Sequence, residues 1–350
     1  MALILDIGRP DSGMEKYSSF VIANLNPAKH ILLESKYKKY SHHFTRGTHS
    51  VRSYTSPKDI IWKTIFVLPY WLLAAVFFCI IKNQRTIYLP YFNHWNVFFA
   101  VVYRLLGGKV VLTVHDGKMH LGDYNPITQF LMNLNILLAT DIIVLSNHVI
   151  SEIPKSLLNG KKIHLVPHGI IEVNDVIPLE IVTSKPTILF IGKISKYKGI
   201  ELLLEAMKDI PDDSYEKLVI AGKANYEITF PPNPKFRILN KWLSATEIAE
   251  LINASDIMIF PYLEATQSGA LTLAISGCRP IICTDVGGLT EQVSPEEAVI
   301  VKPLSESISK AVSGLIQDTE RRASMIKSLK NKKQELSWAE LGKKIDQVIG

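Results

Sequence analysis

The sequence predicts an α/β protein made of two domains, each built around a doubly wound parallel sheet. Its 350 residues suit two domains, because a typical domain has about 100–200 residues. Short apolar runs alternate with longer helical patterns in both halves of the chain, which is typical of parallel strands joined by helices. Between the halves, residues 171–186 lack strong periodicity and contain two prolines, so they form the predicted linker.

The first half is predicted to begin with a buried strand over 3–8, because a short apolar run ends there at a glycine. A loop then leads through Gly13 into a helix from about Met14. Apolar runs and helical spacing give the remaining elements: strands over 86–89, 110–114, 142–145 and 163–166, and helices over 95–106, 126–138 and 148–158.

The same criteria apply after the linker, where the alternation restarts. They give strands over 187–191, 218–221, 257–260, 281–284 and 298–301, and helices over 199–207, 245–253 and 267–275. From about Ser305 the chain is helical and charged. The predicted organisation is a first domain over 1–170, a second over 187–335, and a C-terminal helix over 336–350 that can pack back on the first domain.

The net charge of +6 lies entirely in the first half of the chain. Residues 1–180 hold 18 Lys or Arg and 12 Asp or Glu, whereas residues 181–350 hold 21 of each. This basic half is either a solvated surface or a face for anionic lipid or an anionic acceptor. A nucleic-acid partner is not expected, because no Lys/Arg cluster is interleaved with aromatic residues.

The three cysteines, Cys79, Cys278 and Cys283, lie in apolar contexts without zinc-binding spacing. They are predicted to be buried thiols in a reducing compartment. The N-terminus has no basic region followed by a cleavage site, which a secretory signal would need. We therefore expect a cytoplasmic protein.

Residues 64–81 form an uncharged stretch of 18 residues between Lys63 and Lys82. This length meets the lower limit for a membrane-spanning helix, but a span would separate the first strand from its sheet. Two other interpretations are a helix buried in the fold and a helix that dips into the membrane interface beside basic residues. Those neighbours are Lys58, Lys63, Lys82 and Arg85.

Two motifs of the second half carry the chemistry. The first, Ile191-Gly-Lys-Ile-Ser-Lys-Tyr-Lys-Gly-Ile200, follows a predicted strand and opens a helix. Its glycines allow the backbone to approach a ligand closely, and Lys193, Lys196 and Lys198 can neutralise a diphosphate. A solvated loop with incidental lysines is the alternative.

The second motif begins at Pro261, directly after the predicted strand 257–260. This strand delivers Glu264 into a loop at its carboxyl end, where open α/β sheets bind ligands. The next four residues open a helix: Thr266, Gln267, Ser268 and Gly269. Amides exposed at a helix N-terminus form an anion site suited to a phosphate. A single Glu on a loop is otherwise most often a solvated carboxylate.

Together these stretches resemble the C-terminal domain of the family-four, GT-B glycosyltransferases. The residues that match the family's motifs, in the family's order, are Gly192, Lys193, Lys198, Gly199, Pro261, Glu264, Ala274, Gly277, Pro280 and Asp285-Val-Gly287-Gly288. The resemblance is strong over about 187–295, whereas the first half is similar only in its pattern of elements.

The resemblance implies two Rossmann-like, doubly wound domains facing a cleft, and retaining transfer of a hexosyl group from a nucleoside-diphosphate sugar. Lys193 and Lys198 would hold the diphosphate, and the amides after Thr266 would cradle the phosphate nearest the sugar. Glu264 would bind hydroxyls of the donor sugar. The family's second carboxylate, which contacts the ribose, is replaced here by Thr272, whose hydroxyl can hydrogen-bond but without charge assistance.

In the first domain the candidate residues are His115 and Gly13. Members of the family often have a His at this strand end, beside the reacting sugar, so His115 is predicted to be catalytic together with Glu264; a His held structurally in a loop is the alternative. Gly13 resembles the family's glycine near the donor phosphate or acceptor. His115, Asp116 and His120 also suggest a metal site, but the family generally needs no metal or other cofactor.

The acceptor is not encoded in any motif. The apolar stretch and the basic first half favour a glycan or polyprenyl-diphosphate-linked acceptor at an anionic membrane surface. The predicted role is surface polysaccharide synthesis (O-antigen, capsule or exopolysaccharide) by an enzyme peripheral on the inner face of the plasma membrane. The alternatives are a protein of the same fold that binds sugar nucleotides without turnover, and another two-Rossmann enzyme such as an epimerase.

Overall fold

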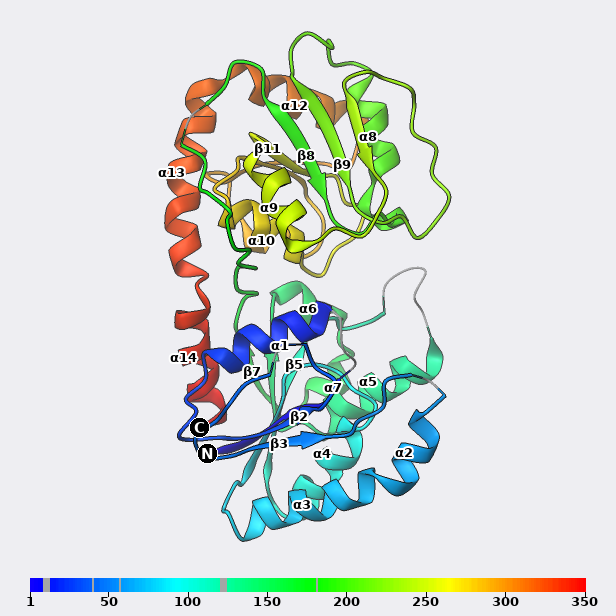
Figure 1. Cartoon of the computed structure of the whole chain (residues 1–350), viewed down its shortest axis with the longest axis vertical. Coiled ribbons are helices and arrows are strands. Elements are labelled where there is room, and N and C mark those ends of the chain that lie inside the picture. Colours follow the sequence, from blue (N-terminus) through cyan, green and yellow to red (C-terminus); the bar gives the residue numbers. More distant parts are fainter. Residues whose placement is uncertain (9–12, 40, 57, 120–124, 181) are drawn as a thin grey trace. The chain divides into compact units, whose positions relative to one another are not determined.

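The computed structural model describes residues 1–8, 13–39, 41–56, 58–119, 125–180 and 182–350. The chain divides into two compact units (Figure 1). Unit 1 comprises Met1–Pro167 and Trp338–Gly350, and unit 2 comprises His168–Ser337. The C-terminal helix therefore belongs to unit 1, and the segment predicted as a linker belongs to unit 2.

Unit 1 is built on a parallel sheet of seven strands in the order β3-β2-β1-β4-β5-β6-β7. The strands are β1 (Ala2–Asp6), β2 (Ile31–Ser35), β3 (Thr48–Val51), β4 (Thr86–Leu89), β5 (Lys109–Val114), β6 (Asp141–Val144) and β7 (Lys162–Leu165). The direction in which strands are added reverses between β1 and β4, and open α/β sheets bind ligands at the carboxyl ends of strands at such a switch point.

Helices cover both faces of this sheet. They are α1 (Gly13–Ala23), α2 (Ile60–Phe66), α3 (Leu68–Ile80), α4 (Asn96–Leu105), α5 (Pro126–Leu138), α6 (Asn147–Glu152), α7 (Lys155–Leu158) and α14 (Trp338–Ile349). Alternate side chains of a strand point to opposite faces, so Leu3 and Leu5 pack with α3, α4 and α5. Ala2 and Ile4 pack with α1 and α14 on the other face.

The uncharged segment 64–81 does not form one continuous helix. It is divided between α2 and α3, which are bent by 49° relative to each other. Pro69 lies in the first turn of α3, and proline cannot donate the backbone hydrogen bond that would continue α2 into α3. Among the described residues no single helix is long and apolar enough to cross a membrane, although the bent pair together meets the criteria of length and composition.

Unit 2 is built on a parallel sheet of six strands in the order β10-β9-β8-β11-β12-β13. The strands are β8 (Thr187–Ile191), β9 (Lys217–Ala221), β10 (Phe236–Leu239), β11 (Ile257–Phe260), β12 (Ile281–Thr284) and β13 (Ala298–Val301). Its helices are η1 (Lys196–Lys198), α8 (Ile200–Met207), α9 (Ala245–Asn253), α10 (Gly269–Ser276), α11 (Leu289–Gln292), α12 (Ser305–Gln317) and α13 (Thr319–Glu335). Its switch point lies between β8 and β11.

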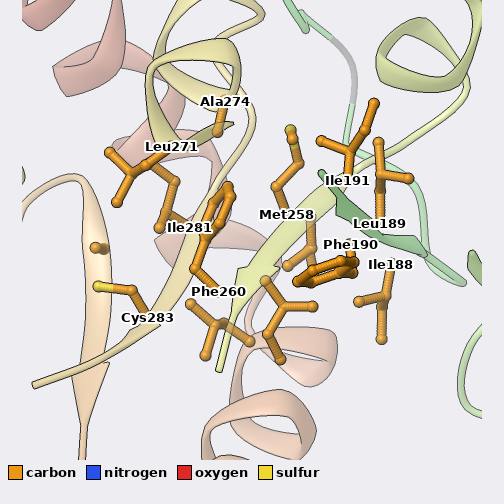
Figure 2. Packing of buried hydrophobic residues seen from close by; sticks show 14 of the residues in the cluster. Ile188, Leu189, Phe190, Ile191, Met258, Phe260, Leu271, Ala274, Ile281 and Cys283 are labelled. Atoms are coloured by element: carbon orange, nitrogen blue, oxygen red, sulfur yellow. The ribbon is translucent and has the colours of Figure 1, made fainter. Parts of the chain in front are cut away.

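The core of unit 2 fixes the position of the two strands at this switch point. Figure 2 shows Phe190 of β8 and Met258 of β11 among the packed apolar side chains, with Leu271 of α10 in the same cluster. All three are fully buried. Because such side chains are close-packed, the loops that follow β8 and β11 start from rigid positions.

Within unit 2, the segment predicted as a linker is anchored by backbone and arginine contacts. Leu179 N donates to Gly277 O at 2.9 Å. Buried Arg279 donates to Ile177 O at 3.0 Å, and buried Arg322 donates to Thr183 O at 2.8 Å. These contacts explain why the segment predicted as a linker packs as part of unit 2. The cysteines Cys79, Cys278 and Cys283 are all unpaired and buried.

Candidate functional site

The principal candidate site lies in unit 2, at the carboxyl ends of β8 and β11. The loop after β8 contacts the loop after β11 through Leu263 N, which donates to Tyr197 O at 2.7 Å. Gly199 has φ +66°, and a Cβ there would lie 1.9 Å from Pro261 O. Only glycine fits this backbone conformation at such a close approach, so Gly199 brings the two motifs together.

A chain of polar contacts links the first motif to the start of α10. Lys198 Nζ donates to the hydroxyl of Tyr262 at 2.7 Å and lies 4.0 Å from the centre of its ring. The Tyr262 hydroxyl lies 3.2 Å from Ser268 Oγ, and Ser268 Oγ accepts from Leu271 N at 3.2 Å. A cation is therefore tied through a buried Tyr to the cap of a helix N-terminus.

The two lysines of the first motif differ in environment. Lys193 is exposed, whereas Lys198 is half-buried. Burial lowers the pKa of Lys198 to about 8, and the neighbouring charge of Lys193 also lowers this pKa, while Tyr197 raises it. A bound anion would offset both the burial of the ammonium and the repulsion between the two lysines, so the arrangement is suited to a phosphate or diphosphate.

The segment before α10 is held by the Asp285-Val-Gly-Gly288 motif and by α11. Gly288 N donates to Ala265 O at 2.9 Å. The side chain of Gln292 accepts from Ser268 N at 2.7 Å and donates to Ser268 O at 3.3 Å. These contacts fix the loop so that the first amides of α10 lie at a defined helix N-terminus, where anions are stabilised.

The predicted donor-binding residues of this loop are exposed to different extents. Thr266 and Ser268 are buried, with 2% and 3% of their surface exposed. Gln267 is half-buried, and its buried Oε1 has no hydrogen-bond partner among the described residues. Gly269 is the first residue of α10. Glu264 is half-buried in the same loop, between exposed Leu263 and buried Ala265.

Thr272, which the resemblance assigned to the donor ribose, has a different environment. It is fully buried within α10. Its hydroxyl donates to Gly269 O at 2.7 Å and accepts from Ile171 N at 3.0 Å. The side chain has no exposed surface in this structure, and the ribose contact at Thr272 stays a prediction. The hydroxyl holds the segment that precedes β8.

Replacing Thr272 with Val is expected to destabilise the protein by about 1–3 kcal/mol, because it leaves the partly buried Ile171 N–H without its acceptor. Urea unfolding of Thr272→Val beside Thr272→Ser, which keeps the hydroxyl, measures this. Nucleotide affinity of the folded variants is expected to stay at the wild-type value. Weaker nucleotide binding by folded Thr272→Val than by Thr272→Ser would instead support the ribose contact.

In unit 1, His115 follows β5 and is 6% exposed. Its Nε2 lies 3.1 Å from Pro90 O, so Nε2 carries the proton, because a carbonyl oxygen only accepts. Its buried Nδ1 has no partner among the described residues. Burial lowers the pKa of His115, so the ring is neutral at pH 7. It lines a cavity of about 170 Å³ with Asp116, Phe92 and apolar residues of β5 and α5.

A second polar cluster, at the switch point of unit 1, has no counterpart among the sequence predictions. Tyr91 OH donates to Asp6 Oδ1 at 2.8 Å and accepts from Gly8 N at 2.6 Å. Lys38 pairs with the other oxygen of Asp6, and both side chains are 1% exposed. The cluster fixes the end of β1 and the start of the segment that leads to Gly13, the first residue of α1.

The suggested metal site at His115, Asp116 and His120 is only partly described, because His120 lies outside the described residues. Within the described residues there is no group of three or more His, Cys, Asp or Glu side chains that could hold a metal ion.

Comparison with known proteins finds a family similarity in unit 2. Residues 174–332 match the family described as glycosyl transferases group 1. The GDP-mannose:glycolipid 4-beta-D-mannosyltransferase of Xanthomonas campestris is 26% identical over 117 residues, which are 31% of this chain and 34% of that protein. The match thus spans about a third of the relative's length.

Two solved structures match the whole chain in fold. The Anabaena protein HepE in complex with UDP has a TM-score of 0.74 at 13% identity, covering 100% of this chain and 99% of its own. Sucrose-phosphate synthase from Thermosynechococcus elongatus has a TM-score of 0.70 at 16% identity, covering 99% and 98%. The two Rossmann-like domains thus have the GT-B fold, and residues 174–332 of the second domain match the group 1 glycosyl transferases.

Proposed function

We propose that the protein is a retaining glycosyltransferase that moves a hexosyl group from a nucleoside-diphosphate sugar to a glycan acceptor. The observation that carries the proposal is the chain from Lys198 through Tyr262 to Ser268 at the N-terminus of α10. Negative charge develops on the diphosphate as the sugar leaves, and a fixed ammonium and helix-end amides favour that charge. Glu264, in the same loop, binds hydroxyls of the donor sugar.

The related proteins support this donor class. HepE was solved with UDP, and the Xanthomonas relative is named for GDP-mannose. The shared chemistry is a nucleoside diphosphate. In unit 1 the neutral His115 beside its cavity is the proposed catalytic partner, where its Nδ1 can accept a proton from a hydroxyl.

Retention at the anomeric carbon is a separate part of the proposal. The Xanthomonas relative is named for a β-D-mannosyl product, whereas the sugar of GDP-mannose is α-linked, so a β product marks inversion. The anomeric coupling of the product, measured by NMR with the donor that this protein accepts, decides the point. A product whose anomeric configuration is opposite to that of the donor would contradict the retaining mechanism. The proposal that the protein is a glycosyltransferase would still hold.

The proposed acceptor is a lipid-linked glycan, such as a polyprenyl-diphosphate carrier in surface polysaccharide synthesis. The enzyme would then work in the cytoplasm, peripherally on the inner face of the plasma membrane. The glycolipid acceptor in the name of the Xanthomonas relative and the exposed apolar residues of α2 and α3 support this setting.

A thermal-shift panel of nucleoside diphosphates and their sugars tests the proposal. A ligand present at 100 times its Kd adds about 2.7 kcal/mol to the free energy of unfolding, so the correct nucleotide should clearly raise the Tm. A folded protein whose Tm responds to no nucleotide would contradict the proposal. Binding without transfer or donor hydrolysis would favour the alternative, a sugar-nucleotide-binding protein without turnover.

Transfer is expected to proceed at an unchanged rate in EDTA. Lys193, Lys198 and the amides of α10 supply the positive charge that a divalent ion supplies in other phosphate-transfer sites. Initial rates with and without chelator, followed by addition of Mg²⁺ or Mn²⁺, measure this. Loss of activity in EDTA that either ion restores would show that the positive charge of the site is insufficient alone.

A further inference from the structure

The helical layer of unit 1 formed by α2, α3, α4 and α5 has an apolar outer surface. A helix on a soluble domain normally carries polar residues on the face opposite its core. In this layer the outward positions are instead large apolar side chains that are each 37–81% exposed: Ile61, Trp62, Ile65, Phe66, Tyr70, Leu73, Phe77, Ile80, Phe98, Val101, Leu105, Ile127, Phe130 and Leu137.

These exposed residues recur at helical spacing, so they form stripes. In α3 the stripe is Tyr70, Leu73, Phe77 and Ile80, while the opposite side of the helix, with Ala75 and Phe78, is buried in the core. The stripe of α4 is Phe98, Val101 and Leu105. Since α2 packs on α3, α3 on α4, and α4 on α5, the stripes join into one surface.

Unit 2 provides an internal comparison. Its exposed large apolar residues in the described part of the chain are Ile177, Trp242, Leu263 and Leu304, and all four lie outside its helices. The exposed apolar surface is therefore a particular property of the helical layer of unit 1. A contiguous surface of this kind marks contact with a membrane or another protein.

The exposed charges around this surface are mainly cationic, and Asp59 at the start of α2 is paired with Lys63 at 2.8 Å. Residues 60–115 contain five Lys or Arg and no Asp or Glu, and α5 carries no charged residue. Exposed Lys82 and Arg85 follow α3, and exposed Arg104 lies in the last turn of α4. An apolar face with a cationic rim is complementary to a bilayer that contains anionic lipid.

A groove at the edge of this layer adds a polar subsite. It has a volume of about 790 Å³ and lies between α3 and the amino-terminal ends of β2 and β3. Aromatic side chains, among them Trp71 and Phe77, line it together with the cations Arg46 and Lys82. Because these are the amino-terminal ends of the strands, the groove lies at the opposite edge of the sheet from His115.

We propose that the outer face of α2–α5 docks on an anionic bilayer, with the phosphate of a lipid headgroup in the groove beside Arg46 and Lys82. The bound lipid is an anchor and not the acceptor, because the groove and His115 are at opposite sheet edges. A second copy of the chain is the less suitable occupant, since a two-fold interface would bring two identical cationic rims together. The membrane setting of this proposal rests on the proposed function. The docking surface on α2–α5 is nevertheless separate from the donor site.

Co-sedimentation of the full chain with vesicles tests the proposal. We expect binding to phosphatidylcholine vesicles that contain phosphatidylglycerol, and much weaker binding to phosphatidylcholine alone. The double variant Leu73→Asn/Phe77→Asn should lower the partition coefficient about tenfold or more, because both apolar side chains lose their contact with lipid. Trp242→Asn, at an equally exposed position of unit 2, is the matched control and should bind as wild type.

A second pair of double variants tests whether the positive charge of the groove contributes to vesicle binding. Arg46→Glu/Lys82→Glu should reduce binding to anionic vesicles at least about fivefold and leave the weak binding to neutral vesicles unchanged. Two exposed lysines of unit 2, in Lys217→Glu/Lys327→Glu, match the change in net charge. An equal loss of binding to anionic vesicles in both double variants would show that the net charge of the protein determines binding. It would contradict a headgroup site at Arg46 and Lys82.

Two further results would overturn docking altogether. One is a chain that stays in the supernatant with every vesicle. The other is a concentration-dependent dimer that Leu73→Asn/Phe77→Asn dissociates, which would assign the face to a second copy. The nucleotide-induced shift in Tm, measured on the same variants, separates the proposals: vesicle binding without any nucleotide shift would leave the docking surface in place while the transferase proposal fails.

Discussion

Replacing Glu264 with Gln is expected to lower kcat/KM for sugar transfer by about 100-fold or more, with little change in nucleotide affinity. Hydrogen bonds from sugar hydroxyls to a carboxylate contribute about 1.5–3 kcal/mol each, and the isosteric amide keeps the shape but loses the charge. The loop is fixed by Gly288 N, which donates to Ala265 O, so the protein should fold normally. Steady-state kinetics and thermal melting of the variant measure both effects.

The matched control is Glu320→Gln, at an exposed position of α13, which should retain the wild-type rate. Two results would contradict the assigned role of Glu264. A wild-type rate in Glu264→Gln would remove the carboxylate from the reaction. A loss of affinity for the free nucleoside diphosphate, with transfer otherwise unchanged, would place Glu264 at the nucleotide and not at the sugar.

Most strands of both sheets could be predicted from sequence, including the edge strands β7 and β13, whereas the edge strands β3 and β10 could not. The strand predicted over 86–89 coincides with β4, and the helices over 126–138 and 245–253 coincide with α5 and α9. The edge strands β3 and β10 were missed because each has four residues, most of them partly exposed. Such strands lack the continuous apolar run that marks a buried strand.

Two other differences have local causes. β2 is fully buried but was missed, because only Ile31, Leu32 and Leu33 form its apolar run before Glu34 and Ser35. The helix predicted over 148–158 is divided into α6 and α7, because Pro154 lies between them.

The candidate site could also be predicted only in part, because its contacts join residues that are far apart in the sequence. Motif order placed Lys198 and Glu264 in adjoining loops, but the residues that connect those loops were not foreseen. Tyr262 acts through a contact 64 residues away in sequence, and Gln292 through one 24 residues away. The motif position of Thr272 assigned its hydroxyl to a ligand. In the structure this hydroxyl accepts a hydrogen bond from Ile171 N, which is 101 residues away in sequence. Only the tertiary fold brings these pairs together.

Replacing Lys198 with Met is expected to weaken nucleoside-diphosphate binding by about 10–100-fold, the equivalent of one charge-assisted hydrogen bond of about 1.5–3 kcal/mol. Lys198→Arg keeps the positive charge, so its affinity for the nucleoside diphosphate should fall less than that of Lys198→Met. Isothermal titration with the nucleotide identified by thermal shift measures the affinities. Equal binding by wild type and Lys198→Met would show that the diphosphate does not contact this ammonium.

The pH dependence of binding provides a more specific test of Lys198. Its pKa is about 8 in the ligand-free protein, and a bound diphosphate raises this pKa by favouring the charged form. Below pH 8 the ammonium is already protonated, so affinity is constant; above pH 8 binding requires proton uptake, so affinity falls and approaches a tenfold loss per pH unit. Removing the charge in Lys193→Met should move this fall to higher pH, because Lys193 lowers the pKa of Lys198. Since Met does not titrate, Lys198→Met should bind with a flat profile over this range, and a fall that persists in that variant would assign the titration to another group.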